Sequence, residues 1–246
     1  MKTANPALSD KVFTGYARVA YPGEAMTIQG TVNKSALLLL LVFLSAAWLW
    51  SMRLTNAGQM APWIGVGAIG GFIVALVTIF NPAWAGVTAP LYAVLEGLLI
   101  GGLSSLMELQ FPGIVLQAVG LTFGTCLCLL VAYRSGLIRA TEKFKLGVVS
   151  ATGAIALVYF TVLILGLFGV RVPYLFSSGP IGILFSLFVV TIAALNLVLD
   201  FDFIETSARA GAPRYMEWYG AFALMVTLIW LYIEILRLLA LLRGRE

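Results

Sequence analysis

Three carboxylates close a long apolar stretch in the second half of the chain. The residues from Leu195 to Glu205 read Leu-Asn-Leu-Val-Leu-Asp-Phe-Asp-Phe-Ile-Glu. Carboxylate oxygens at the mouth of an apolar cavity suit a hard cation such as Ca²⁺. Acids that crowd together also raise each other's pKa, which brings their titration toward physiological pH. The stretch therefore predicts a pH-sensitive ion pathway with Asn196, Asp200, Asp202 and Glu205, in which Asp200 and Asp202 are the Ca²⁺ ligands.

A helix end in water is a second interpretation of the same stretch. Arg209 and Arg214 follow the acids within a few residues. Basic side chains are favourable near the C-terminus of a helix, where they also pair with nearby acids. In that case the carboxylates would be solvated and would bind no ion. The residues alone leave both interpretations open.

Glu96 is a further acid, about two turns inside another apolar segment. A carboxylate at the centre of a membrane span costs about 2.5–3.5 kcal/mol on insertion scales, so such residues usually face a cavity or a partner. We expect Glu96 either to line the ion pathway or, as a protonated acid, to bond a neighbouring helix.

The last apolar segment carries secondary candidates. Thr227 and Glu234 are seven residues apart, which places them on one stripe of a helix. Glu234 and Arg237 are three apart and can form an ion pair, which we expect to anchor the helix end. Together with Glu217 at the start of the segment, these residues are kept as possible parts of the pathway.

The composition identifies an integral membrane protein. Hydrophobic residues make up 61% of the chain and charged residues 11%, whereas soluble domains carry about 25% charged residues. The net charge of +4 comes from Lys and Arg between apolar runs. This pattern is typical of loops at a bilayer surface and not of a nucleic-acid interface. We expect the lipid bilayer as a partner and no nucleic acid.

Residue types also argue against an enzyme. The chain has no histidine, which excludes His-based triads and most catalytic zinc sites. Asp200 and Asp202 lie on one predicted helix, so they do not form an aspartyl pair on facing helices. Cys126 and Cys128 are two residues apart on a helix, point about 200° apart and cannot bridge each other. We expect no enzymatic activity and no cofactor, with Ca²⁺ as the transported ion.

Seven apolar segments follow a polar leader at residues 1–34. Each is close to the 20 or so residues that a bilayer requires, and each must be helical because lipid offers the backbone no hydrogen-bond partners. We predict one transmembrane domain of seven helices at residues 35–246. The segments lie at about 35–53, 62–80, 89–108, 113–133, 146–169, 180–200 and 217–242.

Proline and glycine mark the breaks and the close helix contacts. Ala89-Pro90 is predicted to open the third helix, since proline lacks the donor that a continuing helix needs. Phe111-Pro112-Gly113 forms the turn into the fourth. Pairs of glycines four residues apart allow helices to approach closely, and two such pairs are Gly67/Gly71 and Gly97/Gly101.

Basic residues predict the orientation. The leader and the loop at 134–145 each hold four Lys or Arg, whereas the connections on the other side hold only Arg53 and Arg171. This bias predicts a cytoplasmic N-terminus in a cell inner membrane, with Glu96 and the two aspartates in the cytoplasmic half. Seven spans would place Arg243 and Arg245 outside, whereas six spans, or a last segment that re-enters, would bring this basic tail inside.

Four stretches give the chain a resemblance to a known family. Between Met26 and Leu242 it resembles the bacterial branch of the Bax-inhibitor family, whose members carry the transmembrane Bax-inhibitor motif. The stretches are Met26-Thr-Ile-Gln-Gly-Thr-Val-Asn-Lys, Thr88-Ala-Pro-Leu-Tyr-Ala-Val-Leu-Glu-Gly, Leu195–Glu205, and Tyr215-Met-Glu-Trp-Tyr through Leu236-Arg-Leu-Leu.

The resemblance implies both a fold and a function. The implied fold is a seven-helix bundle with the last helix packed centrally. The implied function is a pH-sensitive calcium leak gated by acids of the sixth and seventh helices. Asp202 fits the sixth-helix acid best, and Glu96 matches the family's Glu-Gly step. Thr227 stands where many relatives carry the second aspartate. We therefore expect either that Asp200 and Asp202, Glu217 or Glu234 substitute for it, or that the gating is lost.

The resemblance also implies a second function of a different class. Some relatives bind and modulate a membrane-anchored protease. The alternative to a calcium leak is therefore a membrane regulator that conducts nothing and binds such a protease or another partner.

Overall fold

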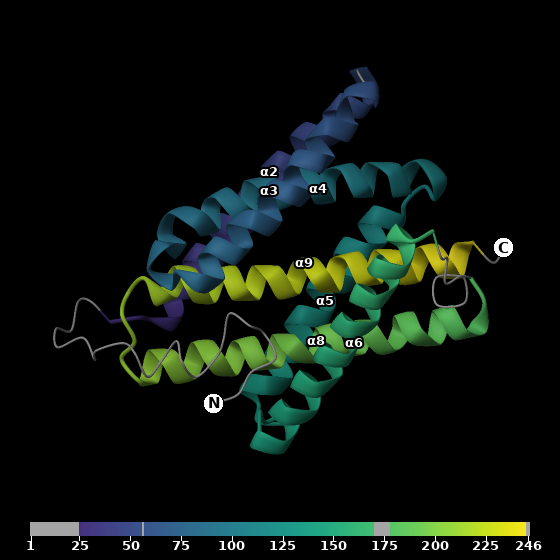
Figure 1. The fold of residues 1–246 in the computed structure, drawn as a ribbon. Helices are drawn as coiled ribbons and strands as arrows, with labels where there is room; N and C mark the ends of the chain where they lie inside the picture. The colour runs from purple at the N-terminus through teal and green to yellow at the C-terminus, as the bar shows by residue number, and fades with distance from the viewer. Residues whose placement is uncertain (1–24, 56, 170–177, 245–246) are drawn as a thin grey trace. The chain divides into compact units, whose positions relative to one another are not determined.

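The computed structural model describes residues 25–55, 57–169 and 178–244. Within them, seven helices are long and apolar enough to cross a membrane. Figure 1 draws these helices as a ribbon. The prediction of an all-α membrane protein with seven spans is confirmed. The helices are α2 (Ile28–Thr55), α3 (Met60–Phe80), α4 (Ala85–Gln110), α5 (Ile114–Arg134), α6 (Glu142–Leu167), α8 (Pro180–Arg209) and α9 (Met216–Arg243).

The last helix is the most buried of the seven. In its most apolar window 56% of the residues of α9 are buried, against 50% for α4, 44% for α8 and at most 22% for the other helices. The central position that the resemblance implies for the last helix stays a prediction.

Helix α2 begins at Ile28, inside the stretch predicted as a polar leader. The reason is an N-cap: the amide of Gly30 donates to Oγ1 of Thr27 at 2.9 Å, which satisfies one of the free donors at a helix start. Residues 28–34 of the supposed leader are thus the first turns of this helix. Residues 1–24 of the predicted leader lie outside the described part of the chain.

Helix α4 begins at Ala85 and runs through Pro90, so the prediction that Pro90 opens this helix is wrong. A short 3₁₀ turn at Pro82–Trp84 precedes it. Proline lacks the amide that would donate a hydrogen bond to the carbonyl four residues earlier. At Pro90 that carbonyl lies in the first turn of the helix, so the loss of this one bond leaves the rest of α4 intact. The predicted turn at Phe111-Pro112-Gly113 is confirmed between α4 and α5, with Gly113 at φ 81°.

The chain divides into two compact units. Of the described residues, those from 25 to 112 and from 200 to 226 form what we call the α2–α4 unit, and those from 113 to 199 and from 227 onward form the α5–α6 unit. The long helices α8 and α9 contribute a segment to each unit.

The α2–α4 unit depends on close glycine contacts. In it α4 packs against both α2 and α3. A Cβ placed on Gly101 would lie 2.6 Å from Cα of Ala46 in α2. A Cβ on Gly67 of α3 would lie 2.6 Å from the carbonyl oxygen of Leu95 in α4. The predicted role of these glycines in helix packing is confirmed.

The α5–α6 unit has an apolar core of its own. Ile155 of α6 packs with Val189 and Ile192 of α8, and Trp230 of α9 packs against them. The guanidinium of Arg243 donates to Oε1 of Gln117 at 2.9 Å, which links the end of α9 to α5.

Candidate functional site

The acids that close α8 have three different environments. Asp200 is 1% exposed, Asp202 is half-buried, and Glu205 pairs with Arg209 one turn later at the helix surface. The interpretation as a solvated helix end therefore holds for Glu205, whose side chain is 30% exposed, and not for Asp200.

Helix geometry separates the two aspartates. Side chains two residues apart leave a helix about 200° apart, so Asp200 and Asp202 project from different sides of α8. In the described part of the chain, no three His, Cys, Asp or Glu residues are placed to hold a metal ion. The Ca²⁺ ligand pair stays a prediction, and the helix does not direct the two aspartates to one ion.

Glu96 belongs to α4, and its side chain faces α3 in the α2–α4 unit. Its side chain hydrogen-bonds with the hydroxyl of Tyr92, one turn earlier on the same helix. A Cβ on Gly71 of α3 would lie 3.3 Å from Oε1 of Glu96, so the absence of a side chain there makes room for the acid. Glu96 is thus an intramembrane acid in a helix contact, half-buried and held by a tyrosine.

Asn196 bonds two helices together through its amide nitrogen, and its predicted place on the ion pathway stays a prediction. Its amide nitrogen donates to Oγ1 of Thr152 in α6 and to the carbonyl oxygen of Ile192, both at 2.9 Å. Both contacts lie within the α5–α6 unit. The residue therefore joins α8 to α6.

We expect Asn196→Ala to lower the stability of the protein by about 1 kcal/mol, the usual size of a side-chain hydrogen bond between membrane helices. The melting temperature in detergent measures this. Thr152→Val should have a similar effect, and the double variant should lose little more than either single one. A drop in ion flux as large as that of an Asp200 variant would show instead that Asn196 acts on the ion pathway.

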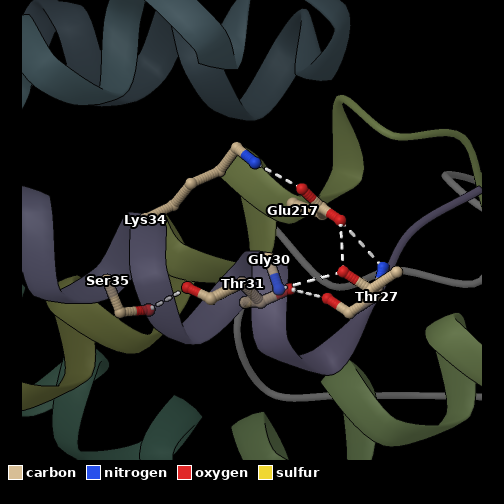
Figure 2. Close-up of polar contacts among 6 residues, drawn as sticks. All are labelled: Thr27, Gly30, Thr31, Lys34, Ser35 and Glu217. Atoms are coloured by element: carbon tan, nitrogen blue, oxygen red, sulfur yellow. Dashed lines mark hydrogen bonds and ion pairs between the residues drawn. The ribbon is translucent and has the colours of Figure 1, made fainter. Parts of the chain in front are cut away.

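Glu217 is an acid that several groups of one other helix bind. It opens α9, is 3% exposed, and forms an ion pair with Lys34 of α2. Its Oε1 also accepts from the amide of Thr27 at 2.9 Å and from the hydroxyl of Thr27 at 2.8 Å. Figure 2 shows the carboxylate facing the first turns of α2. At a helix N-terminus the helix dipole stabilises a negative charge.

Gly30 makes this approach possible. A Cβ at this position would overlap the carboxylate of Glu217, and Figure 2 shows the bare backbone beside the acid. The hydroxyl of Thr27 donates to Glu217 and accepts from the amide of Gly30, so it serves both helices. We call Thr27, Gly30, Lys34 and Glu217 the α2–α9 clasp.

Backbone contacts extend the clasp. The amide of Met26 donates to the carbonyl oxygen of Ala212 at 2.7 Å, and Ala25 forms an antiparallel bridge with Pro213. Gly211, at φ 70°, ends α8 just before these residues. The segment before α2 and the α8–α9 connection are therefore bound together, at the same end of the α2–α4 unit.

Lys34 and Thr27 are functional candidates that sequence reasoning missed. Lys34 counted only as a basic residue of the leader. Two signals were present in the sequence. Met26–Lys34 and the stretch from Tyr215 are both part of the family resemblance, and threonine is a preferred N-cap residue. Neither signal pairs Lys34 with Glu217.

The second polar cluster lies in the α5–α6 unit around Glu234. The predicted ion pair with Arg237 is confirmed at 3.3 Å. The hydroxyl of Tyr159 in α6 donates to Oε1 of Glu234 at 2.7 Å and accepts from Arg237 at 2.6 Å. The guanidinium also lies 5.8 Å from the ring centroid of Phe185. Tyr159 had no distinguishing signal, because one tyrosine in an apolar segment looks like any packing aromatic.

Thr227 is buried in α9, 4% exposed. It carries no charge where the resemblance implies a second aspartate. A gate made of two aspartates on α8 and α9 is therefore not available to this chain in that form.

These features define an α-helical membrane protein with seven helices able to cross the bilayer and several acids buried among them. A family model described as Bax inhibitor 1 like matches residues 5–244, almost the whole chain. The chain therefore belongs to the Bax inhibitor 1 like family. No curated protein and no solved structure matches it.

Proposed function

We propose that the protein is a pH-sensitive passive leak for cations, with Ca²⁺ as the main cargo, in a bacterial inner membrane. The N-terminus would be cytoplasmic, and the acids at that end of the bundle would line the pathway. The protein would catalyse no reaction and hold no cofactor.

Asp200 carries this proposal. It is a carboxylate at 1% exposure within a span, and an acid in such a position is costly and usually serves ion or proton movement. A carboxyl group that changes charge when it binds a proton also makes the conductance depend on pH. The membership of the family supports the same function.

Two further acids lie in the same unit. Glu96 and Glu217 belong with Asp200 to the α2–α4 unit. Carboxylate oxygens are the ligands that a hard divalent cation prefers.

We expect Asp200→Asn to reduce Ca²⁺ flux at least tenfold and to flatten its pH dependence, because the amide neither attracts a cation nor binds a proton. Liposomes loaded with a calcium indicator measure the flux at several pH values. Glu142→Gln is the matched control, because this acid has a 78% exposed side chain at the start of α6. Equal flux for wild type and Asp200→Asn at every pH would contradict the site.

The alternative is a regulator that conducts nothing and binds a membrane protease or another partner. Its support is that Glu217 and Glu205 are engaged by Lys34 and Arg209, as expected of acids with a structural task. If wild-type and protein-free liposomes leak equally and a membrane protease is recovered with the protein, this alternative replaces the leak.

A further inference from the structure

The start of α2, the last turns of α8 and the start of α9 meet in an apolar layer next to the α2–α9 clasp. A Cβ on Gly220 of α9 would lie 3.3 Å from Ile204 of α8, and 3.4 Å from Met26 and from Thr31 at the start of α2. All three neighbours are at most 8% exposed. We call Met26, Thr31, Ile204 and Gly220 the apolar layer, and each belongs to the α2–α4 unit.

The layer excludes water by its composition. Ile204 and Met26 present only apolar atoms, and the methyl group of Thr31 faces Gly220. The hydroxyl of Thr31 is turned back to its own helix and donates to the carbonyl oxygen of Thr27 at 3.0 Å. No polar side-chain group of these four residues is therefore offered to an ion at the layer.

The clasp lies next to the layer and joins two of the helices that form it. Glu217 is three residues, less than one turn, before Gly220 on α9. Its partner Lys34 has a side chain that is 18% exposed. The Nζ atom of Lys34 lies 5.4 Å from the ring centroid of Trp218. The clasp thus joins α2 to α9, and the Met26–Ala212 bond joins α2 to the segment after α8.

We propose that the apolar layer is a hydrophobic gate and that the clasp keeps it shut. This inference rests on the proposed cation leak and names its regulation. Apolar constrictions block ions by excluding water, and small displacements that admit water open them. Separating α2 from α9 at this end breaks the ion pair between Lys34 and Glu217. The buried carboxylate of Glu217 then has no cationic partner, which is energetically costly.

The test combines two readings on one parent variant. Thr31→Cys, with Cys126 and Cys128 both changed to Ala, places the sole thiol in the layer. A charged, membrane-impermeant maleimide reports water at this thiol, and calcium-indicator liposomes report flux. We expect Lys34→Met to raise both the labelling rate and the flux at least fivefold. Lys34→Arg should leave both within twofold of the parent.

Arg209→Met is the control for charge alone. It removes the same positive charge from the same unit, but its ion pair with Glu205 joins two turns of one helix at the surface. We expect it to change neither reading more than twofold. If Lys34→Met does not fold, Glu217→Gln breaks the same ion pair while keeping the shape of the side chain, and the same increases are expected.

The outcomes separate the gate from the leak. If the parent conducts and neither ion-pair variant raises labelling or flux, the gate is overturned. If labelling rises and flux does not, although the parent conducts, the layer is not on the ion pathway and the gate is again overturned. If labelling rises as expected while no variant and no wild-type protein conducts, the clasp-held seal is supported and the proposed leak is wrong.

Discussion

Gly101→Ala should destabilise the protein by about 2–3 kcal/mol, although alanine is the better helix former. The added Cβ would lie 2.6 Å from both Cα and the carbonyl oxygen of Ala46. These are backbone atoms, so the neighbour has no side chain to rotate away, and α2 and α4 must separate. Overpacking of a tight contact costs energy of this size. Thermal unfolding in detergent, followed by tryptophan fluorescence, measures the loss.

Gly124→Ala in α5 is the matched control, with an effect of opposite sign. No atom lies within 4 Å of a Cβ built on Gly124. Alanine should therefore stabilise this helix by about 0.5–1 kcal/mol, the usual preference over glycine in a helix interior. A melting temperature for Gly101→Ala equal to or above that of wild type would show that α2 and α4 do not depend on this contact.

Arg237→Met should cost about 3–5 kcal/mol, the range observed when one partner of a buried ion pair is removed. Arg237 forms the ion pair with Glu234 and donates to Tyr159. Its loss leaves the carboxylate of Glu234 at 3% exposure without its cationic partner, still bonded by the hydroxyl of Tyr159. The unfolding temperature in detergent and the yield of folded protein both measure the effect.

The double variant makes the cause visible. Arg237→Met combined with Glu234→Gln removes the buried charge together with its partner, so it should be more stable than Arg237→Met alone. A double variant that loses the sum of the two single losses would show that the residues act independently, and the ion pair would then not explain the cost.

Hydropathy was enough to predict the seven spans, because lipid leaves a long apolar run no choice but a helix. The exact starts were harder. Thr27 and Thr141 each cap a helix, and each helix begins before its apolar run: α2 at Ile28 and α6 at Glu142. A polar first turn reads as loop in a hydropathy profile, and only the cap bond reveals the helix.

The candidate acids were found by their type, and their environments were not. Asp200 and Glu205 look alike in the sequence, yet one is buried and the other shares a surface ion pair. The side of α8 on which each acid lies decides whether it is buried or exposed. The sequence does not show which side of the helix packs against its neighbours. The contact between Lys34 and Glu217 was beyond reach because nothing local links two residues 183 positions apart.

That separation has a consequence for biosynthesis. The first span is made long before α9 exists, and at about 5–20 residues per second the ribosome needs roughly 10–40 s to supply Glu217 after Lys34. During this interval the ammonium group has to be accommodated by water and lipid headgroups near the membrane surface. The joining of the two chain segments is therefore a late, post-insertional step, and a nascent chain stopped before α9 lacks the partner that completes the end of its first helix.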